Sequence, residues 1–220
     1  MNSAEFLLWV RGTGLQIATV IFVFGIIVRF LEILSLGRKE NLAEHRGSGV
    51  SQGIRTMFSR SIPIDKNTAR RSMFTFLTGY VFHIGLFVVI FLLAPHISFF
   101  KSILGFAWPS ISTPIVDFFA VLTMVSLLAV LYRRITHPVL KTLSTSQDYF
   151  VWLLTFIPVL TGYMSYHHLL LPYNWMLGTH ILSVELMLIF LPFTKLTHAF
   201  TLFLARWYTG SLAGQKGVKS

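Results

Sequence analysis

The sequence contains five apolar runs that are each long enough to cross a lipid bilayer as an α-helix. A hydrocarbon core about 30 Å thick needs about 20 helical residues, and a helix satisfies its own backbone hydrogen bonds where water is absent. The runs lie near residues 13–35, 73–96, 113–132, 149–170 and 176–194, and we expect the last to continue to about residue 208. We therefore predict an all-α membrane protein in which residues 1–208 form one bundle of five transmembrane helices.

The composition agrees with a membrane protein. The 220 residues are 54% hydrophobic and only 12% charged, which is too apolar for a typical soluble domain. The net charge of +10 raises the question of nucleic-acid binding, but the basic residues lie between the apolar runs and form no basic face interleaved with aromatic residues. The charge therefore indicates membrane topology, and we expect no nucleic-acid partner.

Basic residues concentrate on alternate loops. The loop 37–71 and the C-terminal residues 209–220 are basic, and Arg133 and Arg134 mark the next loop on the same side. The positive-inside rule places these segments in the cytoplasm. We predict an outside N-terminus, a cytoplasmic loop at 37–71 and a flexible cytoplasmic tail at 209–220.

The chain has no cysteine, so histidine and methionine are its only soft metal ligands. Thiol catalysis, disulfides and Cys-ligated zinc or iron–sulfur clusters are excluded for this chain. No P-loop, dinucleotide-binding glycine pattern, zinc-protease motif or nucleophile elbow is present. The sequence gives no support to hydrolytic catalysis.

Histidines in the apolar runs are the main candidates for function. An imidazole buried without a partner costs about 2–7 kcal/mol, and ionisable residues within a membrane are functional by default. The alternative for each ring is a hydrogen bond to a nearby backbone carbonyl. The six candidates in or at the ends of apolar runs are His83, His96, His167, His168, His180 and His198.

Two of these histidines define two membrane depths. His180 and His198 are eighteen residues apart, about five turns or 27 Å on an ideal helix, and so share one face; Pro192 between them predicts a kink. Helices two and five are antiparallel, so His83 can face His198 and supply the two axial imidazoles of a b-type haem. Gly79 lies one turn before His83, and this small residue suits either a flat macrocycle or a neighbouring helix.

The second axial partner at the other depth is open. His96 would lie about 140° around the helix from His83, although Pro95 could redirect it. His167 or His168 at the end of the fourth run is an alternative partner for His180. Any of the three could instead line a quinone pocket or sit in interfacial water.

The segments Phe82-His-Ile-Gly85 and His180 to His198, the latter through Phe190-Leu-Pro-Phe193-Thr-Lys195, resemble the gamma subunit of respiratory nitrate reductase. This family of membrane cytochromes b extends to subunits of sulfite-reductase-associated and heterodisulfide-reductase-like complexes. The resemblance covers five spans and is specific in these two segments.

The resemblance implies a ligand set. His83 and His198 match the ligands of the cytoplasmic-side haem, and His180 matches one ligand of the outer haem. The chain departs from the family at the other outer ligand, where it has Leu93, and His96 follows three residues later. The resemblance also implies haem b as cofactor, the prokaryotic inner membrane as location and a cytoplasmic iron–sulfur subunit as partner.

Charged residues near the expected outer face are quinone-site candidates. Asp117 and Glu185 lie within apolar runs, and acidic residues in membrane spans are rare and usually paired or hydrated. Lys101 could donate a hydrogen bond to a quinone carbonyl. The alternative is that each is a helix-end charge in interfacial water. Menaquinone or ubiquinone would be the substrate.

We therefore expect an electron-transfer subunit of an oxidoreductase complex, which connects the quinone pool to the iron–sulfur partner through one or two bis-histidine haems. A haem-free anchor of a peripheral complex would share the topology without needing the histidines. A proton-coupled permease would use Glu185 and Asp117, but five unequal spans lack the matching halves of an inverted repeat.

Overall fold

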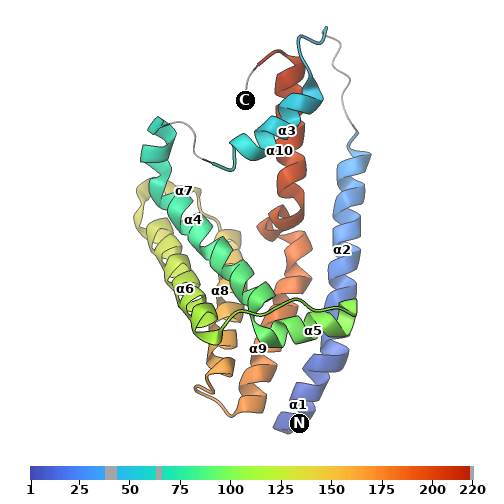
Figure 1. Ribbon diagram of the computed structural model, residues 1–220, viewed down its shortest axis with the longest axis vertical. Coiled ribbons are helices and arrows are strands. Elements are labelled where there is room, and N and C mark those ends of the chain that lie inside the picture. The colour runs from blue at the N-terminus through green and yellow to red at the C-terminus, as the bar shows by residue number, and fades with distance from the viewer. Residues whose placement is uncertain (38–43, 63–65, 219–220) are drawn as a thin grey trace. The chain divides into compact units, whose positions relative to one another are not determined.

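The computed structural model of the chain describes residues 1–37, 44–62 and 66–218. Throughout this described part the elements are helical and no strand occurs, which confirms the predicted all-α class (Figure 1). The elements are α1 (Ser3–Trp9), the π-helical turn η1 (Val10–Gly14), α2 (Leu15–Ser35), α3 (Gly49–Ser59), α4 (Lys66–Leu92), α5 (Ala94–Leu104), α6 (Thr113–Thr136), α7 (Pro138–Leu143), α8 (Ser146–Tyr166), α9 (Tyr173–Phe190), the 3₁₀ turns η2 (Leu191–Phe193) and η3 (Lys195–Thr197), and α10 (His198–Gln215).

Five helices are long and apolar enough to cross a membrane, as predicted. They are Ser3–Ser35, Arg70–Leu92, Thr113–Thr136, Ser146–Tyr166 and Tyr173–Phe193. Large apolar side chains remain exposed along them; on α2, for example, Val20, Phe24 and Leu31 are exposed. Such surfaces are stable against lipid and not against water. The chain is a multi-pass membrane protein.

The first span begins about ten residues earlier than predicted. Asn2 accepts a hydrogen bond from the Glu5 amide, and the Glu5 carboxylate accepts one from the Asn2 amide. This capping box satisfies two amide groups that a helix start leaves unpaired, so the helix forms before the strongly apolar run begins. The π-helical turn η1 then interrupts the α-helical pattern of backbone hydrogen bonds before α2.

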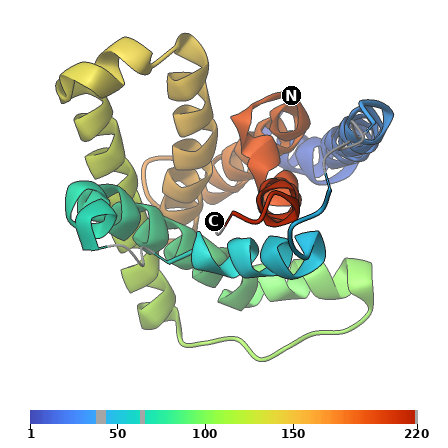
Figure 2. The ribbon, with the colours of Figure 1, turned by 90° about the horizontal axis from the view of Figure 1, so that it is seen from above.

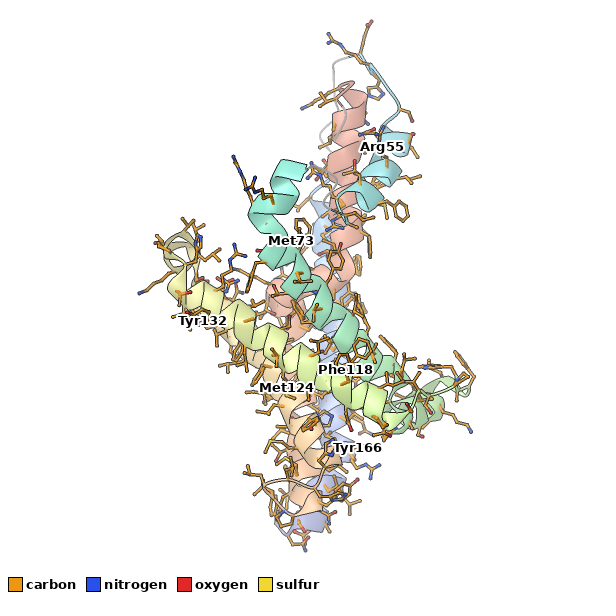
Figure 3. The ribbon with its side chains drawn as sticks, turned by 60° about the vertical axis from the view of Figure 1, so that its left-hand side comes forward. Arg55, Met73, Phe118, Met124, Tyr132 and Tyr166 are labelled. Carbon is orange, nitrogen blue, oxygen red and sulfur yellow. The ribbon has the colours of Figure 1, made fainter. Side chains whose placement is uncertain are left out.

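The chain falls into two compact units, Met1–Ile21 with Phe74–Phe190 and Phe22–Met73 with Leu191–Ser220. In the first unit, α9 contacts α8 and also α1 and η1, and α6 contacts α8. Helix α4 packs on α6, where the Ser126 hydroxyl donates to the Thr78 carbonyl over 2.8 Å. Gly85 makes this approach possible, because a Cβ atom there would overlap the Thr123 hydroxyl. Figure 3 shows α4 crossing α6, with Phe118 and Tyr132 toward the two ends of α6.

The second unit contains a helix that the sequence did not predict. We expected a loop at 37–71, of which residues 38–43 and 63–65 lie outside the described part, but α3 forms within it and packs along α10 (Figures 1 and 2). Glycines permit the contact: Cβ atoms on Gly53 and Gly210 would collide with Trp207 and with Thr56, respectively. The Ser48 side chain caps the start of α3 by accepting from the Ser51 amide.

The expected tail at 209–220 is also different. Helix α10 continues to Gln215, and Gly214 packs against Gln52 of α3. The tail is therefore helical for its first seven residues because α3 covers its small-residue face. Residues 219 and 220 lie outside the described part.

The last membrane span does not continue as one helix to residue 208. Helix α9 ends at Phe190, and η2 and η3 precede α10. Pro192 has no N–H to continue the ladder, and the carbonyls that this break exposes find other donors. The Thr197 hydroxyl lies 2.7 Å from the Thr194 carbonyl, and Arg29 Nε donates to the Pro192 carbonyl over 2.8 Å.

Candidate redox site

His96 on α5 and His180 on α9 face each other in the first unit. Their ring centroids are 6.1 Å apart and their planes are inclined by 21°. The two residues come from different helices, so tertiary packing alone brings the rings together. This pair is the candidate site.

A break between α4 and α5 places His96 toward His180. Helix α4 ends at Leu92, Leu93 has extended backbone angles, and α5 starts with Ala94 and Pro95. Proline has no N–H, and in a continuous helix its ring would clash with the carbonyl four residues earlier, so Pro95 ends α4 and suits the first turn of a new helix. The offset of about 140° that a continuous helix would impose between His83 and His96 therefore does not apply.

Each ring uses Nδ1 for a hydrogen bond within the protein. His96 Nδ1 lies 2.9 Å from the Val89 carbonyl, which can only accept, so this nitrogen carries the proton. His180 Nδ1 lies 3.4 Å from the Thr161 hydroxyl, which itself donates to the Ile157 carbonyl over 2.7 Å. Metal-binding histidines commonly donate one ring N–H in this way, which fixes the tautomer and directs the other nitrogen to the metal.

The surroundings keep the site apolar, and one glycine lies close to a ring. Burial lowers the pKa of His96 below its ordinary value of 6.5. The hydrogen bond to the Val89 carbonyl raises this pKa, but by less than burial lowers it. The ring is therefore neutral at neutral pH, the form that binds a metal. Gly162 of α8 leaves room for the partner ring, because a Cβ atom there would lie 2.9 Å from His180 Cε1.

The spacing of the two rings fits one metal ion between them. Two imidazoles that each direct one nitrogen at the same ion, with metal–nitrogen bonds of about 2 Å and about 1.1 Å from nitrogen to ring centre, would have their centroids about 6 Å apart. No group of three or more potential metal ligands occurs among the described residues, but haem needs only two, since its porphyrin fills the equatorial positions. The donor set at this site therefore fits a bis-histidine haem.

The expected pair His83 and His198 is divided between the two units, so their pairing stays a prediction. In each of these two residues, as in His96 and His180, the Nδ1 atom lies close to an oxygen atom of the protein. His83 Nδ1 lies 2.7 Å from the Gly79 carbonyl, and His198 Nδ1 lies 2.7 Å from the Lys195 carbonyl. Gly79 has open space around its Cα, whereas Gly85 is accounted for by helix packing.

The alternative partners of His180 have neighbours of their own. His167 Nε2 lies 3.2 Å from Asp117 Oδ1, outside hydrogen-bond geometry, and its ring packs 4.4 Å from Tyr163. The His168 ring packs 4.9 Å from Tyr173. The structure thus favours His96 over either residue as the partner of His180.

The three expected quinone-site residues occupy three different surroundings. Lys101 is exposed on α5, one turn and a half after His96. Asp117 at the start of α6 faces His167. Glu185 is only 2% exposed and faces η1, on the other side of α9 from His180. The structure does not gather them into one pocket.

Sequence reasoning missed the residues that position the two rings. These are Val89, Thr161 and Gly162. A threonine and a glycine side by side within the apolar run 149–170 were a usable signal, because small and hydroxylated residues mark helix contacts in membranes. The Val89 carbonyl had no sequence signal, since any residue type could supply it.

Comparison with known proteins gives one relative. The chain is 29% identical over 166 residues to a protein of Nitratidesulfovibrio vulgaris (strain Hildenborough) that is described only as "Protein"; the match covers 76% of this chain and 73% of the relative. No protein-family model matches the chain. No solved structure matches it.

Proposed function

We propose that the chain is a cytochrome b subunit that carries electrons between membrane quinone and a partner redox subunit. His96 and His180 would hold one haem b, and the sequence predicts a second one at His83 and His198. The observation that carries the proposal is the spacing of 6.1 Å between two nearly parallel imidazoles inside a membrane protein.

The chain's own residues have defined tasks in this proposal. The Val89 carbonyl and the Thr161 hydroxyl orient the two rings through Nδ1, and Gly162 gives the His180 ring its space. The apolar surroundings keep water from the site. A bound haem would supply a one-electron iron couple whose potential depends on its ligands and on burial.

The overall reaction is oxidation of a quinol to a quinone, which releases two protons and two electrons. The protons leave at the expected outer face, and the electrons pass to a cytoplasmic iron–sulfur subunit. That partner would dock on the basic segments, which include Arg55 on α3 and Arg60 directly after it. We propose the prokaryotic inner membrane as the location, because the chain has five candidate spans and the similar protein comes from a bacterium.

The test is a haem count on the purified full chain, with axial ligands identified by electron paramagnetic resonance. We expect one or two low-spin bis-histidine haems per chain. His96→Ala and His180→Ala should each remove the same haem, whereas His137→Ala, at an exposed loop histidine, should remove none. Full haem content in both His96→Ala and His180→Ala would contradict the proposal for this pair.

A colourless but correctly folded preparation would instead favour a haem-free anchor of a peripheral complex. A proton-coupled permease has one observation in its favour, the buried carboxyl of Glu185. Proton-driven uptake by liposomes that contain this chain alone would support the permease and count against an electron carrier.

A further inference from the structure

Glu185 is a buried carboxyl whose Oε1 atom lacks a hydrogen-bond partner in the part of the chain that the structure describes. The residue is 2% exposed and lies in the middle of the last span. An ionised carboxylate without a partner is very costly in apolar surroundings, and such a group takes up a proton instead. The Oε1 atom is therefore a group that needs a proton or a donor.

The carboxyl is closed off by the first span. A Cβ atom on Gly14 would lie 2.9 Å from Glu185 Oε2 and 3.0 Å from Oε1. Gly14 ends the π-helical turn η1, and π-turns within helices occur frequently at functional sites. The backbone of one membrane helix thus lies directly against the acid of another.

No cation takes the place of the missing donor at Oε1 among the described residues. Arg11 on η1 is exposed, and Glu5 on α1 is bonded to Asn2. The other titratable groups on α9 and on the elements that contact it are His96 and Lys101 on α5, Asp148, Tyr149, Tyr163 and Tyr166 on α8 with His167 directly after it, and Tyr173 and His180 on α9 itself.

Glu185 and His180 lie on two sides of the same helix. Five residues separate them, which is about 7.5 Å along the axis and about 140° around it. His180 faces Thr161 and Gly162 of α8, and Glu185 faces Gly14 of η1. A change in charge at His180 would act on the acid through apolar protein, where screening is weak.

We propose that Glu185 is a proton-binding site that is linked to reduction of the haem at His96 and His180. The positive charge of an oxidised haem would favour the ionised carboxylate, and its loss on reduction would favour the neutral acid. Each electron accepted would therefore be accompanied by one proton taken from water onto the Glu185 carboxylate. Oxidation releases both. This inference rests on the proposed function. The proton site at Glu185 and the electron site at His180 would lie on opposite sides of α9.

The test is a redox titration of the haem-loaded full chain between pH 6 and 9. One proton per electron lowers the midpoint potential by about 59 mV per pH unit. We expect a slope that approaches this value over part of the range in the native chain, and a nearly flat line in Glu185→Gln with unchanged haem content. The matched control is Glu32→Gln, an exposed glutamate paired with Arg29, which should keep the native slope.

A second readout is the infrared difference between the reduced and oxidised protein. The native chain should show a carboxylic-acid C=O band that shifts in D₂O and disappears in Glu185→Gln. Equal slopes in the native chain and in Glu185→Gln, steep or flat, would overturn the inference and leave the haem assignment intact. A preparation without haem would overturn both.

Discussion

The rings of His96 and His180 face each other at 6.1 Å between centroids, although one begins a short helix after a break and the other lies within a membrane span. The break at Leu93 makes the pairing possible, because it frees His96 from the helical register of His83. The membrane cytochromes that the sequence resembles would have an outer ligand at the position of Leu93, and this chain has a histidine three residues later, at His96. The difference from those proteins and the break in the helix thus occur at the same place.

Thr161→Val should weaken haem binding at this pair. The substitution removes the hydroxyl beside His180 Nδ1, and loss of such a supporting hydrogen bond typically costs 10- to 100-fold in metal affinity. The measurement is haem loss to an excess of a haem-binding acceptor protein. Thr155→Val is the matched control, since its hydroxyl donates to the Val151 carbonyl of the same helix. Equal haem loss from the two variants would show that Thr161 does not position the ring.

Gly162→Val should displace the His180 ring. A Cβ atom would lie 2.9 Å from His180 Cε1, closer than real contacts allow, and the ring would have to move. We expect the optical spectrum to change from low-spin to high-spin as one axial ligand is lost. Gly12→Val is the control, because nothing lies within 4 Å of a Cβ atom at that position. A low-spin spectrum in Gly162→Val would mean that the ring tolerates the larger neighbour.

Thr197→Val should destabilise the turn between α9 and α10. The hydroxyl lies within 3.1 Å of three carbonyls, those of Leu191, Pro192 and Thr194. A polar group left without a partner costs about 1–3 kcal/mol, so we expect faster hydrogen exchange in this turn. Thr201→Val removes a hydroxyl that donates to the Thr197 carbonyl, and it should have a smaller effect. Matching exchange rates in the two variants would argue against the role of Thr197.

Gly210→Val should separate α3 from α10. A side chain there would collide with Thr56 and would lie 2.8 Å from the Gln52 carbonyl, and overpacking of this kind costs about 1–3 kcal/mol. We expect proteolysis within α3 at a protease concentration that leaves the native chain intact. Ala205→Val changes an exposed position of α10 and should behave like the native chain. Protection of α3 in Gly210→Val would show that the contact is less close than the structure indicates.

The sequence by itself determined the five spans and the set of candidate ligands. Each span follows from local properties, namely about 20 apolar residues and the need to satisfy backbone groups in lipid. The same local reasoning failed at α3, whose apolar positions are few and whose stability comes from glycine-mediated contact with α10. It also failed for the last span, which we expected to continue to about residue 208: α9 ends at Phe190, before Pro192 and the turn that Thr197 stabilises.

Only the tertiary structure decided which histidine faces His180 and what surrounds Glu185. The sequence offered His96 as the partner of His180 and His167 or His168 as alternatives, and it could not decide among them because all three lie near the ends of apolar runs. Their distances to His180 depend on a break of a few residues and on how whole helices pack. Hydrophobicity determines that a segment enters the membrane, but the hydrophobic effect has no direction. Which side chains face each other is therefore set by close packing at positions such as Gly14 and Gly162.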